Sequence, residues 1–147
     1  MMSCDNFKNH KCSKCDNRRI IVVEQKRSKY TLNNAPEKYI CKIDVDGCLI
    51  TDGMRCDYLI INCDDNVAYF VELKGKNLSH AIEQITQSLT LLSDKITGCK
   101  INARIVLTKV TTPTTKDYHQ KLRFEKLLRG YKNGNLKKGT IQFVEPE

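Results

Sequence analysis

The stretch that decides the fold is Cys56-Asp57-Tyr58-Leu59-Ile60-Ile61-Asn62-Cys63-Asp64-Asp65-Asn66-Val67-Ala68-Tyr69-Phe70-Val71-Glu72-Leu73-Lys74. Two apolar runs rich in β-branched and aromatic residues, 58–61 and 67–71, flank a polar segment at 64–66. Two apolar strands on either side of a turn made of Asp and Asn residues are typical of a β-hairpin. A hairpin that turns at 64–66 brings residue 57 close to residues 72–74.

Three charged residues stand at the open end of this predicted hairpin, although buried strands do not normally contain charged residues. Asp57 begins the first strand, and Glu72 and Lys74 end the second. Side chains two residues apart in a strand point to the same face, so we expect Glu72 and Lys74 to project together. The sequence therefore predicts one patch with two carboxylates and one ammonium group.

Such a patch is suited to binding a divalent cation. Mg²⁺ and Mn²⁺ prefer oxygen ligands, which Asp57 and Glu72 supply, and the carbonyl oxygen of Leu73 is a further candidate ligand. A divalent cation makes a bound water a stronger acid. Lys74 is then the residue expected to orient that water or to neutralise charge on a phosphate.

Asp57, fourteen intervening residues and Glu72-Leu73-Lys74 resemble the D-(x)n-(D/E)-x-K signature of the PD-(D/E)xK nucleases. The resemblance covers about residues 40–110, and Cys56 stands where the family often has a proline. It implies a restriction-endonuclease-like fold and a Mg²⁺-dependent (or Mn²⁺-dependent) endonuclease that hydrolyses phosphodiester bonds in nucleic acid, with DNA as the favoured substrate.

Residues after the hairpin predict an amphipathic helix that runs to about Lys95, with Asn77 or Ser79 as its cap. Its apolar residues recur at spacings of four and three, namely at Leu78, Ile82, Ile85, Leu89 and Leu92. That spacing forms one helix face for packing on a sheet. In some branches of the resembled family a glutamine on this helix reaches the active site, which makes Gln84 a catalytic candidate; a solvated glutamine is the alternative. Those branches often have a tyrosine four residues later, where Ser88 stands here.

The rest of the chain predicts strands and helices that alternate. Residues 39–73 predict a β-meander, 19–30 contain a β-branched strand, and 102–110 and 140–144 contain two more strands. A helix is expected over 116–129, with Leu122, Leu127 and Leu128 facing inward, and a basic loop over 130–139.

This order indicates an α/β or α+β fold in a single domain over 1–147, with a mixed central sheet flanked by helices. It agrees with the restriction-endonuclease-like core, apart from the helix with a glutamate that usually begins that core. Glu24 and Glu37 are the candidates for this glutamate, and neither lies in a convincing helical pattern.

Composition points to a polyanionic partner and not to a membrane. Lys and Arg number 25 against 17 Asp and Glu, which gives a formal net charge of +8. Such a surface suits nucleic acid, and a basic protein without such a partner is the alternative. No apolar run has the length of a membrane span, and no signal peptide is evident, so a cytoplasmic protein is expected. A homodimer is one candidate assembly. The candidate nucleic-acid-binding residues are Lys76, Lys116, Lys121, Arg123, Lys132, Lys137 and Lys138.

Residues 1–18 form a cysteine-rich segment within a chain of eight cysteines. In a cytoplasmic protein, cysteines favour metal ligation or reduced thiols over disulfides. The C-x-x-C spacing of Cys12 and Cys15 is suited to one tetrahedral Zn²⁺, and Cys4 is a nearby third ligand. Other candidate ligands are His10, Cys41, Cys48 and Cys56. Free thiols without a metal are the alternative.

Two other functions compete with the nuclease. The first is a non-catalytic nucleic-acid-binding protein with a nuclease-like fold, which would normally lose the carboxylates or the lysine. The second is a zinc-stabilised adaptor, in which the cysteines are the functional feature and Glu72-Leu73-Lys74 forms a structural ion pair.

Overall fold

The computed structural model describes residues 3–75, 77–110 and 112–147, and only the backbone of Ser3 and Lys74. The strands are β1 (Ser13–Asp16), β2 (Ile20–Gln25), β3 (Ser28–Asn33), β4 (Ile40–Asp44), β5 (Tyr58–Asn62), β6 (Val67–Gly75), β7 (Lys100–Leu107), β8 (Leu136–Thr140) and β9 (Gln142–Pro146). The helices are α1 (Leu78–Leu92) and α2 (Thr115–Arg129), with short 3-10 helices η1 (Ser3–Asn6) and η2 (Ser93–Lys95). Neither α-helix in these ranges has the length and apolar character needed to cross a membrane.

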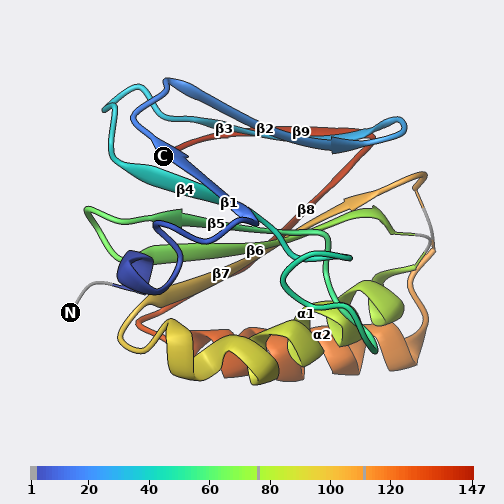
Figure 1. The fold of residues 1–147 in the computed structure, drawn as a ribbon. Coiled ribbons are helices and arrows are strands. Elements are labelled where there is room, and N and C mark those ends of the chain that lie inside the picture. Colours follow the sequence, from blue (N-terminus) through green and yellow to red (C-terminus); the bar gives the residue numbers. More distant parts are fainter. Residues whose placement is uncertain (1–2, 76, 111) are drawn as a thin grey trace.

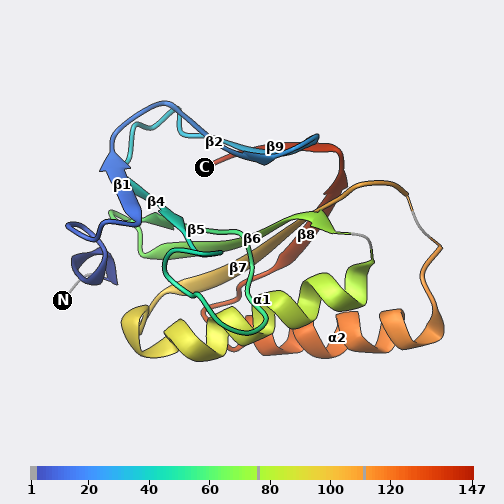
Figure 2. The same cartoon turned by 45° about the vertical axis from the view of Figure 1, so that its right-hand side comes forward.

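All described strands belong to one mixed sheet, in the order β1-β4-β5-β6-β7-β8-β9-β3-β2. The pairs β6–β7, β7–β8 and β3–β9 are parallel, and the others are antiparallel. The sheet curls, so that β2, β3 and β9 lie over one face of the remaining strands while α1 and α2 cover the other face (Figures 1 and 2). The expected mixed α+β architecture is confirmed at this level.

The bend between β8 and β9 makes the curl possible. Ile141 adopts a positive φ of 63°, which a β-branched residue rarely does. Two backbone hydrogen bonds hold it there, because its N–H donates to Leu107 O at 2.8 Å and its carbonyl accepts from Lys29 N at 2.9 Å. The chain therefore leaves the main layer at this residue and runs back beside β3.

Two hydrophobic cores result, one on each face of the main layer. The core under the helices includes Phe70 and Ile105 and the five apolar residues of α1 that the sequence predicted. The inner core, between the two layers of strands, includes Tyr30, Val71 and Leu73. Both faces of β5 and β6 are buried over much of their length, which agrees with the uninterrupted apolar runs at 58–61 and 67–71.

The central hairpin and α1 are confirmed. β5 and β6 are antiparallel, with Tyr58 opposite Val71 and Asn62 opposite Val67. The turn between them ends at Asn66 in the left-handed conformation, with φ 54°, which asparagine tolerates well. The side chain of Asn77 caps α1, as expected, by accepting a 2.8 Å hydrogen bond from the N–H of His80.

The β-branched strand expected within 19–30 is β2, after which the chain turns at Lys26 and Arg27 and returns as β3. Two details of the predicted elements are wrong. The expected loop over 130–139 contains most of β8, which pairs with β7. On α2, Leu122 and Leu127 are exposed, and the residue that packs inward with Leu128 is Phe124, four positions before it.

Candidate active site

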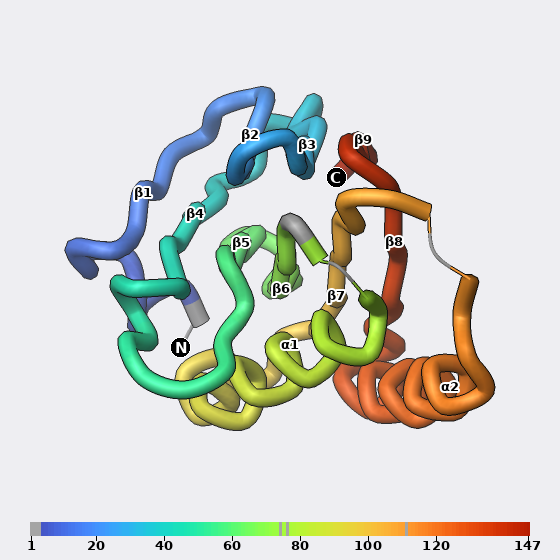
Figure 3. Tube along the Cα trace, turned by 90° about the vertical axis from the view of Figure 1, so that its right-hand side faces the viewer, coloured from blue at the N-terminus to red at the C-terminus, as the bar shows by residue number. Residues whose placement is uncertain are grey.

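A cleft of about 740 Å³ opens at one end of the sheet. It lies where β6 ends, α1 begins and the β2–β3 hairpin turns, three segments that Figure 3 shows around the same end of the molecule. The lining residues come from these elements and from the chain after β7 and β8: Lys26, Arg27, Ser28, Glu72, Leu73, Gly75, Asn77, His80, Gln84, Thr108 and Ile141.

Asp57 and Glu72 lie opposite each other on adjacent strands beside this cleft. The register of β5 and β6 pairs Tyr58 with Val71, and the N–H of Asp57 continues it by donating to Val71 O at 3.1 Å. Residues opposite each other in antiparallel strands have side chains on the same face, about 5 Å apart at Cβ. Both side chains are nearly buried, with exposed fractions of 6% for Asp57 and 5% for Glu72. The hairpin register therefore brings Asp57 and Glu72 to the same end of the sheet.

The carboxylate of Asp57 accepts hydrogen bonds from two distant parts of the chain. The backbone N–H of Leu73 donates to Oδ2 at 2.7 Å. The side-chain Nε2 of Gln25, at the end of β2, donates to Oδ1 at 3.3 Å. Both bonds favour one orientation of the carboxylate. Gln25 was not among the predicted site residues, because it comes from a hairpin outside the predicted meander.

A β-bulge interrupts β6 at the predicted motif. Glu72 pairs with Ile105 and Gly75 pairs with Leu107, so β6 has one residue more than β7 over this interval. A bulge redirects side chains locally, so the simple alternation expected for Glu72, Leu73 and Lys74 does not follow from the strand geometry here. The side chain of Leu73 packs in the inner core, and the side chain of Lys74 lies outside the described part of the structure.

Helix α1 is joined to the residue before Asp57. Ser88 is fully buried on α1, and its Oγ accepts a 2.8 Å hydrogen bond from the N–H of Cys56. Burial is the main cause that raises the pKa of the Cys56 thiol to about 12; the hydrogen bond with Ser88 acts against it, and the nearby charges of Glu72 and Asp57 add to it. Cys56 therefore remains a neutral thiol beside two carboxylates.

Gln84 lies in the cleft with Glu72, as the resemblance implied. Its Nε2 donates to the carbonyl of Arg55 at 3.3 Å, which is a second connection between α1 and the segment that leads into Asp57. His80, one turn earlier on α1, also lines the cleft and is exposed. Glu24 and Glu37, the candidates for the family's further glutamate, are exposed residues of β2 and of a turn and do not line the cleft.

The basic groups at the cleft differ from the predicted ones. Lys26 and Arg27, at the turn of the β2–β3 hairpin, are exposed and line it. Lys76 lies outside the described residues. The other predicted nucleic-acid contacts lie on α2, on the loop after it and on β8, and none lines the cleft: Lys116, Lys121, Arg123, Lys132, Lys137 and Lys138.

Six of the seven cysteines in the N-terminal half are paired as disulfides: Cys4–Cys63, Cys12–Cys48 and Cys15–Cys41. The preference for thiols over disulfides is wrong for these residues. Cys12 and Cys15 have different partners, so they do not act as one C-x-x-C pair. The reason is the pairing of β1 with β4, which sets Cys15 directly opposite Cys41.

Comparisons with family models, with curated proteins and with solved structures find no match to this chain. Its function is therefore inferred from the residues of the cleft.

Proposed function

We propose that this protein is a divalent-metal-dependent nuclease acting on DNA. The observation that supports this most is the pairing of Asp57 with Glu72, two nearly buried carboxylates opposite each other at the end of a hairpin. Glu72 lines a cleft whose other wall has the basic residues Lys26 and Arg27. A negative centre for a cation beside a positive wall for phosphates is suited to phosphodiester hydrolysis.

The donor atoms at this centre fit Mg²⁺ or Mn²⁺. Carboxylate oxygens of Asp57 and Glu72 would hold the ion, with the carbonyl of Leu73 as a further oxygen donor. Two carboxylates in a nearly buried place repel each other, and a dication relieves that repulsion. When bound, the ion would supply Lewis-acid stabilisation of charge on a phosphate and a more acidic water.

The chain's own residues would orient the reacting groups. Lys74, two residues after Glu72, would position the attacking water or neutralise charge on the phosphate. Gln84 would contact the same reaction centre from α1. The order of elements also supports the proposal, because β4, β5 and β6 form a meander, followed by α1 and by β7 parallel to β6. That order agrees with the restriction-endonuclease-like core that the resemblance implies.

A non-catalytic nucleic-acid-binding protein of the same fold is the competing function. Both oxygens of Asp57 accept hydrogen bonds within the protein, from Leu73 and Gln25. Such bonds would also suit a carboxylate whose role is to join strands. A zinc-stabilised adaptor is a third function, and it predicts no dependence on Mg²⁺.

A nicking assay on supercoiled plasmid separates these functions. The purified protein should cut in Mg²⁺ or Mn²⁺ and be inactive in EDTA. Lys74→Ala should lose activity while its circular dichroism and melting temperature stay unchanged. Lys138→Ala removes the same charge from β8 and should remain active. Undiminished cutting by Lys74→Ala would exclude the proposed site, and metal-independent binding without cutting would favour the non-catalytic protein.

A further inference from the structure

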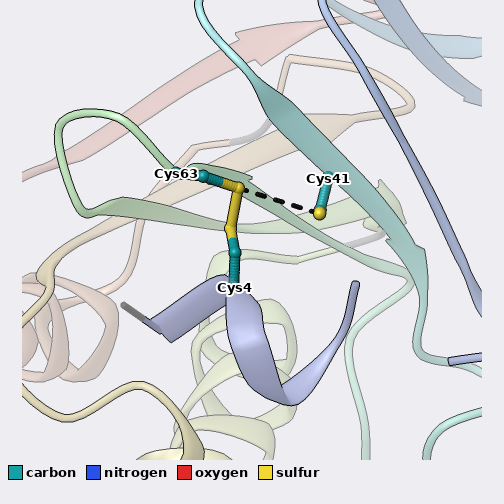
Figure 4. A group of neighbouring side chains, drawn as sticks. All are labelled: Cys4, Cys41 and Cys63. Atoms are coloured by element: carbon teal, nitrogen blue, oxygen red, sulfur yellow. Dashed lines mark hydrogen bonds between the residues drawn. A yellow bond between two sulfur atoms is a disulfide. The ribbon is translucent and has the colours of Figure 1, made fainter. Parts of the chain in front are cut away.

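Three buried sulfur atoms gather near the N-terminus, at the end of the sheet away from the cleft, and a fourth is bonded to one of them. The Sγ atoms of Cys4, Cys41 and Cys63 all lie within 4.8 Å of one another, and all three residues are buried. Figure 4 shows that Cys4 and Cys63 form a disulfide and that Cys41 approaches it from β4. Cys15, directly opposite Cys41 on β1, is bonded to Cys41 and brings a fourth sulfur to the group.

One distance between the two disulfides matches that of a zinc site. The Sγ atoms of Cys41 and Cys63, which belong to different disulfides, are 3.7 Å apart. A tetrahedral Zn²⁺ with Zn–S bonds of about 2.3 Å has its sulfurs about 3.8 Å apart. To form such a site, the two bonded pairs would have to separate, and the Cys15 sulfur, which lies outside the three-sulfur group, would have to turn toward it.

We propose that Cys4, Cys15, Cys41 and Cys63 bind one Zn²⁺ when their disulfides are reduced. The ligands come from η1, β1, β4 and the turn after β5, so the ion would fasten the N-terminal segment to the sheet. That segment buries little apolar surface besides Phe7. Structural zinc sites typically contribute folding free energy in such segments.

The two states are related by a balanced exchange. Each disulfide accepts two electrons and two protons from one molecule of a dithiol, which leaves as its own disulfide. The four thiols formed then bind Zn²⁺ as thiolates and release four protons. Oxidation by a disulfide reverses the process, since each pair of thiolates gives up two electrons, a new Cys–Cys bond forms and the ion leaves.

The surroundings define which cysteines take part. A cavity of about 170 Å³, lined by Cys4, Cys63 and the charged residues Asp5, Lys8 and Asp64, gives solvent a path to the group. Cys15 is bonded to a member of the three-sulfur group, whereas Cys12 and Cys48 are bonded only to each other.

His10 is not suited to complete a C-x-x-C site. Its Nδ1 accepts a 3.1 Å hydrogen bond from the N–H of Cys12, so this nitrogen already has a donor. The structure thus favours four sulfurs over the set of Cys4, Cys12 and Cys15 that sequence spacing suggested.

Full-length protein reduced anaerobically with dithiothreitol, desalted and given ZnCl₂ tests the proposal. Atomic emission should find about one zinc per chain. Cobalt(II) in its place should give the visible spectrum of a four-thiolate tetrahedral site. Cys41→Ser should lose the zinc or change the cobalt spectrum, whereas the matched Cys48→Ser should keep both. Zinc kept by Cys41→Ser and lost from Cys48→Ser would overturn this ligand set, and zinc-free wild-type protein would overturn the site.

A measurement on the wild type remains decisive if Cys41→Ser does not fold. The zinc-loaded protein is titrated with oxidised dithiothreitol or another disulfide, and peptide mapping follows which bonds form. Zinc release should rise in step with Cys4–Cys63 and Cys15–Cys41, and independently of Cys12–Cys48. Release that follows Cys12–Cys48 instead would contradict the proposal.

Discussion

The backbone N–H of Leu73 donates a 2.7 Å hydrogen bond to Oδ2 of Asp57. This bond joins the bulged part of β6 to the carboxylate of the residue that precedes β5. The donor stands between Glu72 and Lys74, so the backbone of the predicted motif is connected directly to Asp57. Asp57 therefore has two separable properties, its capacity to accept this bond and its charge.

Asp57→Asn should separate the two properties. The amide oxygen can still accept from Leu73, so the free energy of unfolding in urea should change by less than about 1 kcal/mol. The lost charge should abolish plasmid nicking, and DNA affinity without metal should hold or increase because one repulsion with phosphate is removed. Asp57→Ala removes the acceptor as well and should cost about 1–3 kcal/mol. An Asp57→Asn protein that is folded but has lost both binding and cutting would identify a recognition surface instead.

Ser88→Ala should destabilise the protein and reduce nicking. It leaves the buried N–H of Cys56 without its acceptor, at a cost of about 1–3 kcal/mol in urea unfolding. Because Cys56 directly precedes Asp57, the rate of nicking should fall even under conditions where the variant is fully folded. Thr90→Ala, an exposed hydroxyl on the same helix, is the control and should change stability by no more than about 0.5 kcal/mol. Equal effects of the two substitutions would show that Ser88 has no positioning role.

Cys56 should resist alkylation in the folded protein. Burial raises its pKa to about 12, so at pH 8 only about one molecule in ten thousand has the reactive thiolate. Iodoacetamide labelling followed by peptide mass spectrometry should be slow at pH 8 and fast in urea. Asp57→Asn should change the native rate little, because burial affects this pKa more than the carboxylate charge does. Rapid native labelling at pH 8 would mean that the thiol is accessible and ionised.

The hairpin and α1 were predictable because local patterns determine them. Apolar residues recur at helical spacing over four turns of α1. The strands on either side of 64–66 are apolar, whereas the turn between them is polar. The pairing of Asp57 with Glu72 then follows from the hairpin register alone. The bulge after Glu72 does not, because it depends on how β6 meets β7, which lies beyond α1 in the chain.

Contacts made by the curled part of the sheet were not predictable. Gln25 reaches Asp57 across 32 residues, and the turn at Lys26 and Arg27 reaches the cleft because β3 pairs in parallel with β9 at the other end of the chain. The periodicity of apolar residues along the sequence does not indicate which distant strands, such as β3 and β9, pair with each other. The cysteine partners depend in the same way on β1 pairing with β4, whereas C-x-x-C spacing describes only neighbours in the chain.

The basic turn of the β2–β3 hairpin should contribute more to DNA binding than the basic residues of β8. Lys26 and Arg27 line the cleft, whereas Lys137 and Lys138 lie outside it, and Lys137 is 3.7 Å from a carboxylate oxygen of Glu145. The double variants Lys26→Ala/Arg27→Ala and Lys137→Ala/Lys138→Ala lose the same charge. Each phosphate contact contributes about 0.9 to the slope of log affinity against log salt on duplex DNA.

Fluorescence anisotropy with a labelled duplex, at several salt concentrations in EDTA, measures this difference. The hairpin variant should weaken binding to all sequences alike and reduce the salt slope by up to about two units, if both residues contact phosphates. The β8 variant should reduce the slope by less than about one unit, because Lys137 is already paired with Glu145. The hairpin variant should also lose nicking at physiological salt, while its metal requirement stays the same. A larger loss from the β8 variant would place the duplex on β8, as the sequence first suggested, and away from the cleft.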